Sequence, residues 1–320
     1  MRKFSPVTSG ITLCLIAACL ICGCTDTGAP ADITGTATAA TPLTADPIDI
    51  ENVTVQTASV DDIQIAYKEF GDGPPLVLIM GYAGTMDMWD VRVLQELARH
   101  YRVVVFDNRG MGLSTSSEKE YTISLFANDT AAFMEAIGRE KAHILGWSMG
   151  SDIALALTHE HPERVDKLIL YAADPGGDES VPMDPEVEKA LLNTSGTPME
   201  RGMRLLSLLF PSDWMAQHPS PEEYFPNVTE STPAENIARQ GEAMGARKGV
   251  SAWLGTVTQP TLLIVGDQDI LARPANSFYI GERIPSASVV QIRGGGHGVM
   301  YQYPEDFTDI VLTFLELEQW

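Results

Sequence analysis

Residues 141–150 read KAHILGWSMG, a short apolar run that ends in the pentapeptide GWSMG. In a G-x-S-x-G pattern the serine, here Ser148, sits on a strained turn between a strand and a helix, and the flanking glycines relieve collisions there. The apolar run before Ser148 predicts a buried strand, and residues 153–158 after it predict a helix. This helix would point its positive N-terminal end at the serine. The stretch therefore predicts a nucleophilic serine at the end of a strand.

Short apolar runs and helical patterns alternate along most of the chain. Six runs are continuously apolar, as expected of strands covered on both faces: 76–80, 102–106, 142–146, 167–173, 261–266 and 288–292. Helical patterns occupy residues 88–100, 123–138, 149–159, 274–283 and 304–317. Residues 53–60 and 63–70 alternate instead, which predicts an antiparallel pair. This order predicts an α/β fold: a mostly parallel sheet of about eight strands, flanked by helices and joined by right-handed crossovers.

No buried strand is evident between Asp174 and Gln259. Residues 203–210 and 234–245 look helical, while several prolines divide the remainder into short pieces. A loop of this length without structure of its own is implausible inside a compact domain. We therefore expect residues 175–258 to form a helical cap over one edge of the sheet, inserted into a core that comprises residues 51–174 and 259–320.

The charge balance and the cysteines limit the possible functions. The chain carries 43 acidic and 21 basic residues, a net charge of −22, which argues against nucleic-acid binding because a phosphate backbone needs a basic surface. This charge would also repel anionic membranes and anionic substrates at long range. All four cysteines lie within the first 24 residues. The rest of the chain therefore offers no disulfide, thiol nucleophile or cysteine-based zinc site, and we expect neither a metal nor a cofactor.

Residues 1–24 have the features of an export signal: Arg2 and Lys3, then an apolar run over residues 11–22, then small residues. The sequence LICGC at 20–24 resembles the lipobox of prokaryotic lipoproteins, which implies that Cys24 becomes the lipidated first residue. A second match ends at Cys19, and a cleaved soluble signal or an uncleaved anchor is an alternative. Residues 25–50, rich in Thr, Ala and Pro, predict a flexible tether. We therefore expect an exported, extracytoplasmic protein held at the membrane surface by a lipid anchor.

Further motifs surround GWSMG. Residues 106–114, FDNRGMGLS, are similar to the D-x-R-G-x-G-x-S loop of the α/β-hydrolase superfamily, and HPERV at 161–165 followed by LIL at 168–170 is also typical of it. From residue 64 to the C-terminus the chain resembles this superfamily, in the branch of small esterases and cofactor-free haloperoxidase-like enzymes. The resemblance implies an α/β-hydrolase fold. It also implies structural roles for Asp107 and Arg109, in a turn and an ion pair that support the site.

A serine hydroxyl needs a base to remove its proton, and the superfamily carries this histidine after the last strand. His297 lies in that place, within GGGHG at 294–298. A carboxylate must then orient the imidazole. GDQD at 266–269 resembles the family's G-x-x-D, which implies Asp269 as the acid, while Asp267 caps the turn or stays solvated. Some relatives draw the acid from the end of the preceding strand, which here is Asp174.

Acyl transfer also needs donors for the oxyanion. One is the backbone N–H of Met149, directly after the nucleophile. MGYAG at 80–84 matches the family's H-G-x-x-G, which implies the N–H of Tyr82 as the second donor. Met80 replaces the family's histidine, so any support that this histidine gives the loop is absent. Trp147, beside the nucleophile, is a candidate for an apolar wall of the substrate site.

The resemblance implies a serine hydrolase that acts on a small-molecule substrate, and carboxylic ester hydrolysis through an acyl-enzyme is the first hypothesis. Ser148 argues against the dehalogenases and epoxide hydrolases of this fold, whose nucleophile is aspartate. Peptidase, lactonase, C–C hydrolase and perhydrolase activities use the same residues and stay open. The hypothesis from another class is a surface-tethered ligand-binding lipoprotein on a hydrolase scaffold. In either case the cap should determine which ligand is accepted.

Overall fold

The computed structural model describes residues 49–50 and 52–318. The predicted signal segment 1–24 with Cys24, and the tether up to residue 48, lie outside these residues and stay predictions. Within the described ranges, no helix has both the length and the apolar character needed to cross a membrane.

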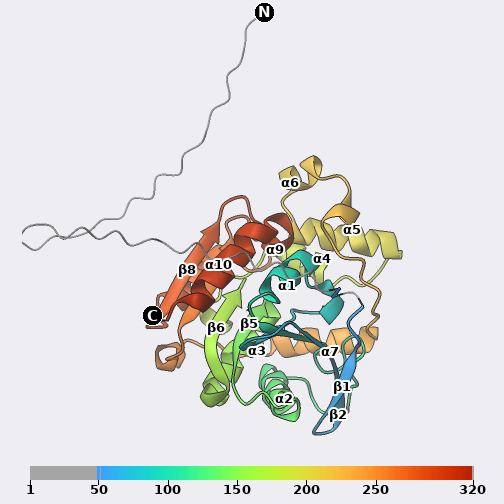
Figure 1. Ribbon diagram of the computed structural model, residues 1–320. Coiled ribbons are helices and arrows are strands. Elements are labelled where there is room, and N and C mark those ends of the chain that lie inside the picture. Colours follow the sequence, from blue (N-terminus) through green and yellow to red (C-terminus); the bar gives the residue numbers. More distant parts are fainter. Residues whose placement is uncertain (1–48, 51, 319–320) are drawn as a thin grey trace, which may run out of the picture. The chain divides into compact units, whose positions relative to one another are not determined.

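In the described part of the chain, an eight-stranded sheet forms the centre of the fold (Figure 1). Its strands are β1 Gln56–Val60, β2 Ile63–Phe70, β3 Pro75–Ile79, β4 Arg102–Phe106, β5 Ala142–Trp147, β6 Val165–Tyr171, β7 Thr261–Gly266 and β8 Ala287–Ile292. They lie in the order β1-β2-β4-β3-β5-β6-β7-β8. β2 is antiparallel to β1 and β4, and the remaining neighbours are parallel. The predicted class, a mostly parallel sheet flanked by helices, is confirmed.

Helices cover both faces of the sheet. α2 Ile123–Ala136, α3 Met149–Glu160 and α8 Pro274–Gly281 pack on one face. α1 Val91–Leu97, α9 Val299–Gln302 and α10 Pro304–Glu316 pack on the other. Successive residues of β3, such as Leu76 and Val77, therefore enter opposite cores, and both are fully buried. This explains why the central strands β3 to β7 are largely apolar in the sequence. The prediction that residues 288–292 are covered on both faces is wrong, because β8 lies at the edge of the sheet and is only partly buried.

Two predicted elements are shorter in the structure. In place of a helix over residues 88–100, Met86–Met88 form a 3-10 turn and α1 begins after Asp90. The Asp90 side chain accepts a hydrogen bond from Arg92 N at 2.8 Å, which caps the new start. The predicted strand 53–60 begins only at Gln56, where its pairing with Tyr67 of β2 starts.

Four helices lie between β6 and β7, in residues 175–258, which we call the insertion: α4 Pro185–Leu191, α5 Pro198–Leu209, α6 Ser212–Gln217 and α7 Ala234–Gly245. Some prolines begin these helices instead of interrupting them, as Pro185 and Pro198 do. α5 starts earlier than the predicted residue 203 because Thr197 and Glu200 form a capping box. α4 packs against α5, and α6 lies at the top of the molecule in Figure 1. Single 3-10 turns lie at Pro162–Arg164, Gly177–Glu179, Pro221–Glu223 and Leu254–Thr256.

Residues 229–232, before α7, form hydrogen bonds between the insertion and the core. Asp87 Oδ2 accepts hydrogen bonds from the backbone N–H groups of Thr229 and Glu230, at 3.0 and 3.2 Å. The backbone N–H of Gly112 donates to Thr232 Oγ1 at 3.0 Å. These bonds bring the Glu230 side chain against carboxylates of the core.

The Glu230 carboxyl shares its site with Asp107. Both carboxyl groups contact Gly112. A Cβ added to this glycine would lie 2.5 Å from Glu230 Oε2 and 2.3 Å from Asp107 Oδ2, so the two oxygens lie on the same side of its backbone. Burial, followed by the charges of Asp107 and Asp87, raises the pKa of Glu230 from 4.5 to about 8. Burial also raises the pKa of Asp107, although the backbone N–H groups of Leu113 and Met86 that donate to this carboxyl act in the opposite direction.

We expect Glu230→Gln to stabilise the protein at alkaline pH and to change little at acidic pH. The pKa of Glu230 is raised on folding, so its contribution to stability is present below 4.5 and is lost as the pH rises through about 8. Glutamine keeps a hydrogen-bond donor and carries no charge. Because Glu230 is partly exposed, the gain in the free energy of unfolding should be on the order of 1 kcal/mol at about pH 9.

Urea unfolding at about pH 5 and about pH 9 measures this gain. The matched control is Glu222→Gln, which removes the same charge from an exposed position of the insertion. A stability difference for Glu230→Gln that does not grow with pH would contradict the interpretation.

Candidate active site

Ser148 lies on a strained turn between β5 and α3. Its backbone has φ 57° and ψ −121°, a conformation that residues with a side chain rarely adopt. A Cβ on Gly146 would lie 2.2 Å from Gly150 O, and a Cβ on Gly150 would lie 2.1 Å from Ile79 O. The glycines of the GWSMG motif are therefore required by backbone contacts, one within the turn and one between α3 and β3.

Hydrogen bonds to β6 hold this turn. Ser148 N donates to Tyr171 O at 2.8 Å. The hydroxyl of Ser151 donates to Gly146 O at 2.7 Å and to Tyr171 O at 3.0 Å. The neighbouring strand therefore fixes the position of the serine at the end of the sheet.

His297 and Asp269 form a buried pair. His297 Nδ1 and Asp269 Oδ2 lie 2.8 Å apart, and the two residues are 3% and 2% exposed. The other carboxylate oxygen, Oδ1, accepts hydrogen bonds from the backbone N–H groups of Leu271 and Ala272, both at 2.9 Å. Oδ1 is thus held by the backbone, and Oδ2 is left to accept a hydrogen bond from Nδ1 of the imidazole.

The His297 loop is held by the core and by the insertion. Tyr171 OH donates to His297 O at 2.5 Å. Gly296 N donates to the side chain of Gln302 at 2.7 Å, and Gly298 N donates to Leu209 O at 2.9 Å. Since Leu209 ends α5, the insertion contributes directly to the position of the imidazole.

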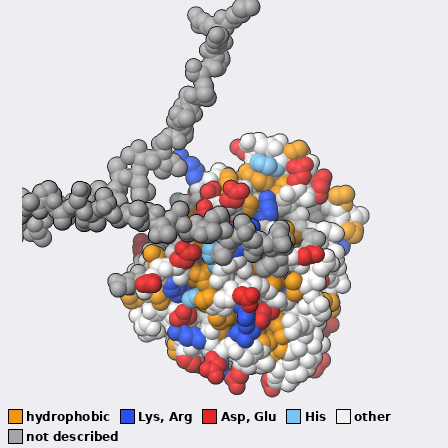
Figure 2. All heavy atoms as spheres, viewed as in Figure 1, with side chains coloured by type: hydrophobic (Ala, Val, Ile, Leu, Met, Phe, Trp, Pro, Cys, Tyr) orange, Lys and Arg blue, Asp and Glu red, His pale blue; other side chains and the backbone are white. Residues whose placement is uncertain are grey.

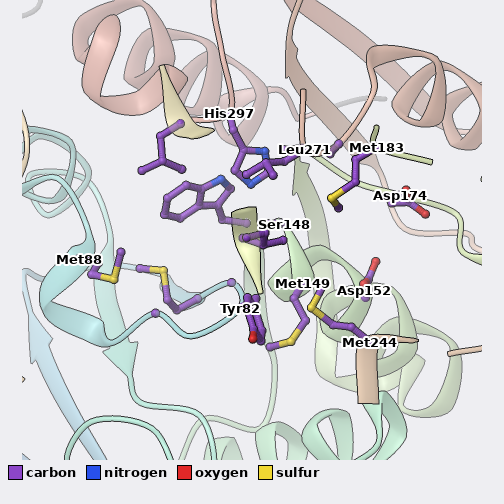
Figure 3. A pocket seen from close by; sticks show the side chains of 18 of the residues that line it. Tyr82, Met88, Ser148, Met149, Asp152, Asp174, Met183, Met244, Leu271 and His297 are labelled. Atoms are coloured by element: carbon purple, nitrogen blue, oxygen red, sulfur yellow. The ribbon is translucent and has the colours of Figure 1, made fainter. Parts of the chain in front are cut away.

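Ser148 and His297 line one pocket, together with Tyr82 and Met149. Figure 3 shows the imidazole of His297 and the side chain of Ser148 directed into this pocket. Neither the backbone N–H of Tyr82 nor that of Met149 donates to an acceptor among the described residues. Both donors are therefore available to a bound molecule.

The loop at residues 80–84 lies against the nucleophile. A Cβ on Gly81 would lie 3.1 Å from Ser148 Cβ. The loop is supported without the family's histidine: Asn108 Nδ2 donates to Met80 O at 3.1 Å, and Ala83 N donates to Gln240 Oε1 at 2.6 Å. Gln240 belongs to α7, so part of this support also comes from the insertion.

Asp174 and Asp267, the other acids considered from the sequence, have different partners from Asp269. Asp174 accepts hydrogen bonds from Ser180 Oγ and Asn276 Nδ2, each at 2.7 Å. Asp267 Oδ1 accepts from Gly294 N at 2.7 Å and so holds the turn beside the His297 loop. The structure therefore brings His297 together with Asp269 and not with Asp174.

Trp147 is buried beneath the site, with 4% of its surface exposed. Its ring stacks on Tyr171 at a centroid distance of 5.6 Å and lies 5.6 Å from the imidazole of His297. It also borders the pocket. The residue predicted as a substrate wall therefore forms the floor on which the imidazole packs.

Asp107 and Arg109 stabilise the loop that follows β4. Arg109 is fully buried and forms two hydrogen bonds with Asp129, at 2.6 and 2.7 Å. Asp107 accepts from the backbone N–H groups of Met86 and Leu113, at 2.7 and 2.8 Å. Neither residue borders the pocket that contains Ser148.

Sequence reasoning missed a charged group in the wall of this pocket. Asp152 and Arg247 both line it, with the Arg247 Nε 3.3 Å from Asp152 Oδ2. Asp152 follows Ser148 by one helical turn, a spacing that places both on one face of α3. That spacing was a usable signal for Asp152, whereas no local pattern pointed to Arg247.

The family model described as alpha/beta hydrolase fold matches residues 74–304. A relative from Caulobacter sp. (strain K31), described as a candidate carbamate hydrolase, RutD, is 29% identical over 271 residues, 82% of this chain and 99% of the relative. A candidate non-heme chloroperoxidase from Synechocystis sp. is 28% identical over 283 residues, 82% of this chain and 99% of that protein. The crystal structure of the enol-lactonase from Burkholderia xenovorans LB400 is 26% identical, with a TM-score of 0.71, and covers 82% of this chain and 100% of its own.

The family match spans most of the chain, so the protein belongs to the α/β-hydrolase family. The superfamily resemblance drawn from the sequence motifs is therefore confirmed. The protein is a hydrolase of the α/β fold.

We expect Gly150→Ala to destabilise the protein by about 3 kcal/mol, because the new Cβ would meet the rigid Ile79 carbonyl. The matched control is Gly202→Ala in the middle of α5, where an added Cβ meets nothing within 4 Å. That change should stabilise by roughly 0.5–1 kcal/mol through helix propensity. Urea unfolding of both variants measures the difference in the free energy of unfolding. Equal changes in the two variants would show that the contact between α3 and β3 does not exclude a side chain at position 150.

Proposed function

We propose that the chain is a carboxylic ester hydrolase that acts on a small acyl substrate through Ser148, His297 and Asp269. The observation that carries this proposal is the buried 2.8 Å contact of His297 Nδ1 with Asp269, in the pocket that also contains Ser148. With Nδ1 donating to the carboxylate, the Nε2 of a neutral imidazole is the basic nitrogen. This is the atom that must take the serine proton.

In the first half-reaction, His297 Nε2 removes the proton from Ser148 Oγ as this oxygen attacks the ester carbonyl carbon. The carbonyl oxygen becomes an oxyanion, which the backbone N–H groups of Met149 and Tyr82 stabilise. The imidazolium then protonates the departing alcohol, and the acyl group stays on Ser148. In the second half-reaction, His297 deprotonates a water molecule that attacks the acyl carbon, so that the carboxylic acid leaves and Ser148 is restored.

The size of the pocket favours a small acyl group. Its volume is about 110 Å³, smaller than the roughly 150 Å³ of an engineered cavity that accommodates benzene. Apolar side chains form much of its wall, among them Met88, Leu205 and Leu209. A lactone is a cyclic ester, so the same steps would serve lactone hydrolysis, and the likeness to an enol-lactonase makes this the second candidate activity.

A fluorophosphonate probe should label the wild-type protein and not Ser148→Ala, because the probe reacts with an activated serine hydroxyl. Hydrolysis of p-nitrophenyl butanoate should fall by a factor of about 10³ or more in the same variant. Ser212→Ala, at an exposed position of α6, is the matched control. Labelling that persists in Ser148→Ala would overturn the proposal. A wild-type protein that neither reacts nor hydrolyses would favour the ligand-binding alternative.

Asp269→Asn should lower kcat by about 10³ to 10⁴, because the amide would no longer hold the imidazole in the required tautomer. Asp267→Asn is the matched control on the same loop, where the side chain is exposed and bonds only to the turn. Its kcat should stay within about tenfold of the wild-type value. Steady-state kinetics on p-nitrophenyl butanoate measures both, and similar losses in the two variants would refute the assignment of Asp269.

A further inference from the structure

One wall of the pocket carries three charged side chains from three separate elements. Asp152 comes from the first turn of α3, Asp174 follows β6, and Arg247 follows α7. Figure 3 shows Asp152 and Asp174 on the same side of Ser148, away from Met88. The proposed acyl and proton-transfer steps use none of these charges.

Arg247 is already engaged by the protein. Its Nη2 donates to Asp174 Oδ1 at 2.8 Å, and its Nη1 donates to Met244 O at 3.0 Å. Asp174 is engaged as well, since it also accepts from Gly176 N, Ser180 Oγ and Asn276 Nδ2. The guanidinium is therefore not presented to an anionic substrate, because its outer nitrogens bond to the protein.

Asp152 is the member of the cluster that lacks hydrogen-bond partners. It is 7% exposed and accepts no hydrogen bond from any described residue. Its nearest charge, Arg247 Nε, lies 3.3 Å away without hydrogen-bond geometry, and this nitrogen is itself unsatisfied. Burial raises the pKa of Asp152 to about 7, the charge of Arg247 opposes this shift, and Asp174 adds to it. A buried carboxylate without donors is costly, so a donor supplied by a ligand would be strongly favoured.

We propose that Asp152 binds a protonated amine on the acyl part of the substrate, so that the enzyme prefers amino-acyl esters to apolar ones. This inference rests on the proposed ester hydrolase function and names the substrate class of that same site. The two carboxyl groups of the cluster outnumber its single guanidinium, and a nearby ammonium would favour the ionised form of Asp152, so this wall would then carry more negative than positive groups. An ammonium group would neutralise that charge and donate to the free oxygen of Asp152.

The position of Asp152 limits where the amine can lie on the substrate. Asp152 lies four positions after Ser148, which corresponds to a rise of about 6 Å along the axis of α3. An amine two or three carbons beyond the ester carbonyl therefore reaches the carboxylate while the carbonyl stays at Ser148. Met149, Met244 and Leu271 line the same pocket and would contact the intervening methylene groups.

The test compares two p-nitrophenyl esters of equal size, the 3-aminopropanoate and the butanoate, which differ by an ammonium in place of a methyl group. At about pH 7 an alkylamine is protonated. Each kcat/KM is divided by the rate of hydroxide hydrolysis of that ester, which removes the difference in intrinsic reactivity. The wild-type protein should then favour the amino ester by at least about tenfold, the value of one hydrogen bond to a charged group.

Asp152→Asn should reduce this preference at least about tenfold, because the amide offers no charge to the ammonium. Asp309→Asn, an exposed position on α10 outside the pocket, is the matched control and should keep the wild-type preference. A second measurement needs no variant: n-butylammonium should inhibit the wild-type protein more strongly than n-butanol or pentanoate.

The outcomes separate this inference from the proposed function. If hydrolysis depends on Ser148 but the wild-type protein shows no preference for the amino ester and no selective inhibition by n-butylammonium, the role of Asp152 is wrong and the esterase function stands. A preference that survives in Asp152→Asn, with folding verified by thermal unfolding, overturns the role as well. If hydrolysis of neither ester depends on Ser148, the proposed function itself fails.

Discussion

The backbone of α3 at Gly150 lies so close to the Ile79 carbonyl at the end of β3 that no side chain fits between them. This contact sets the spacing between the turn that carries Ser148 and the loop that runs from β3 to Tyr82. The proposed nucleophile and both proposed oxyanion donors therefore depend on one piece of backbone packing. The strained conformation of Ser148 persists because this packing and the hydrogen bonds to Tyr171 hold it.

The insertion takes part in the same framework. Leu209 at the end of α5 accepts a hydrogen bond from the His297 loop, and Gln240 of α7 accepts one from Ala83 beside Tyr82. Six of its residues also line the pocket. A displacement of the insertion would therefore alter the shape of the pocket together with the loops that position the base and the oxyanion donors. Substrate fit and catalytic geometry are physically linked here, because the same helices determine both.

The positions of Ser148, Asp269 and His297 could be located from the sequence because each stands in a short motif that follows a strand of the sheet. The Asp152–Arg247–Asp174 cluster could not be located in this way. Its members belong to distant segments, and they are in contact only because the chain after α7 places Arg247 beside Asp152 and Asp174. The support of the Met80 loop by Gln240 was hidden for the same reason. The prolines of the insertion predict breaks, yet Pro185 begins α4, because the first helical turn needs no N–H from proline.

Two negative charge distributions act on a substrate, and they differ in range. The first is the net charge of −22, which Figure 2 shows as acidic side chains spread over the visible face. Salt screens that field beyond about 8 Å at physiological ionic strength. It therefore affects the rate at which a charged substrate meets the protein more than the discrimination between bound substrates. The second is the wall with Asp152, whose side chain is largely buried, so that a charge there is less screened and interacts more strongly with a bound group. On the proposed function, discrimination between an ammonium and a methyl group on the acyl chain therefore arises at this wall, because the screened surface field distinguishes them only weakly.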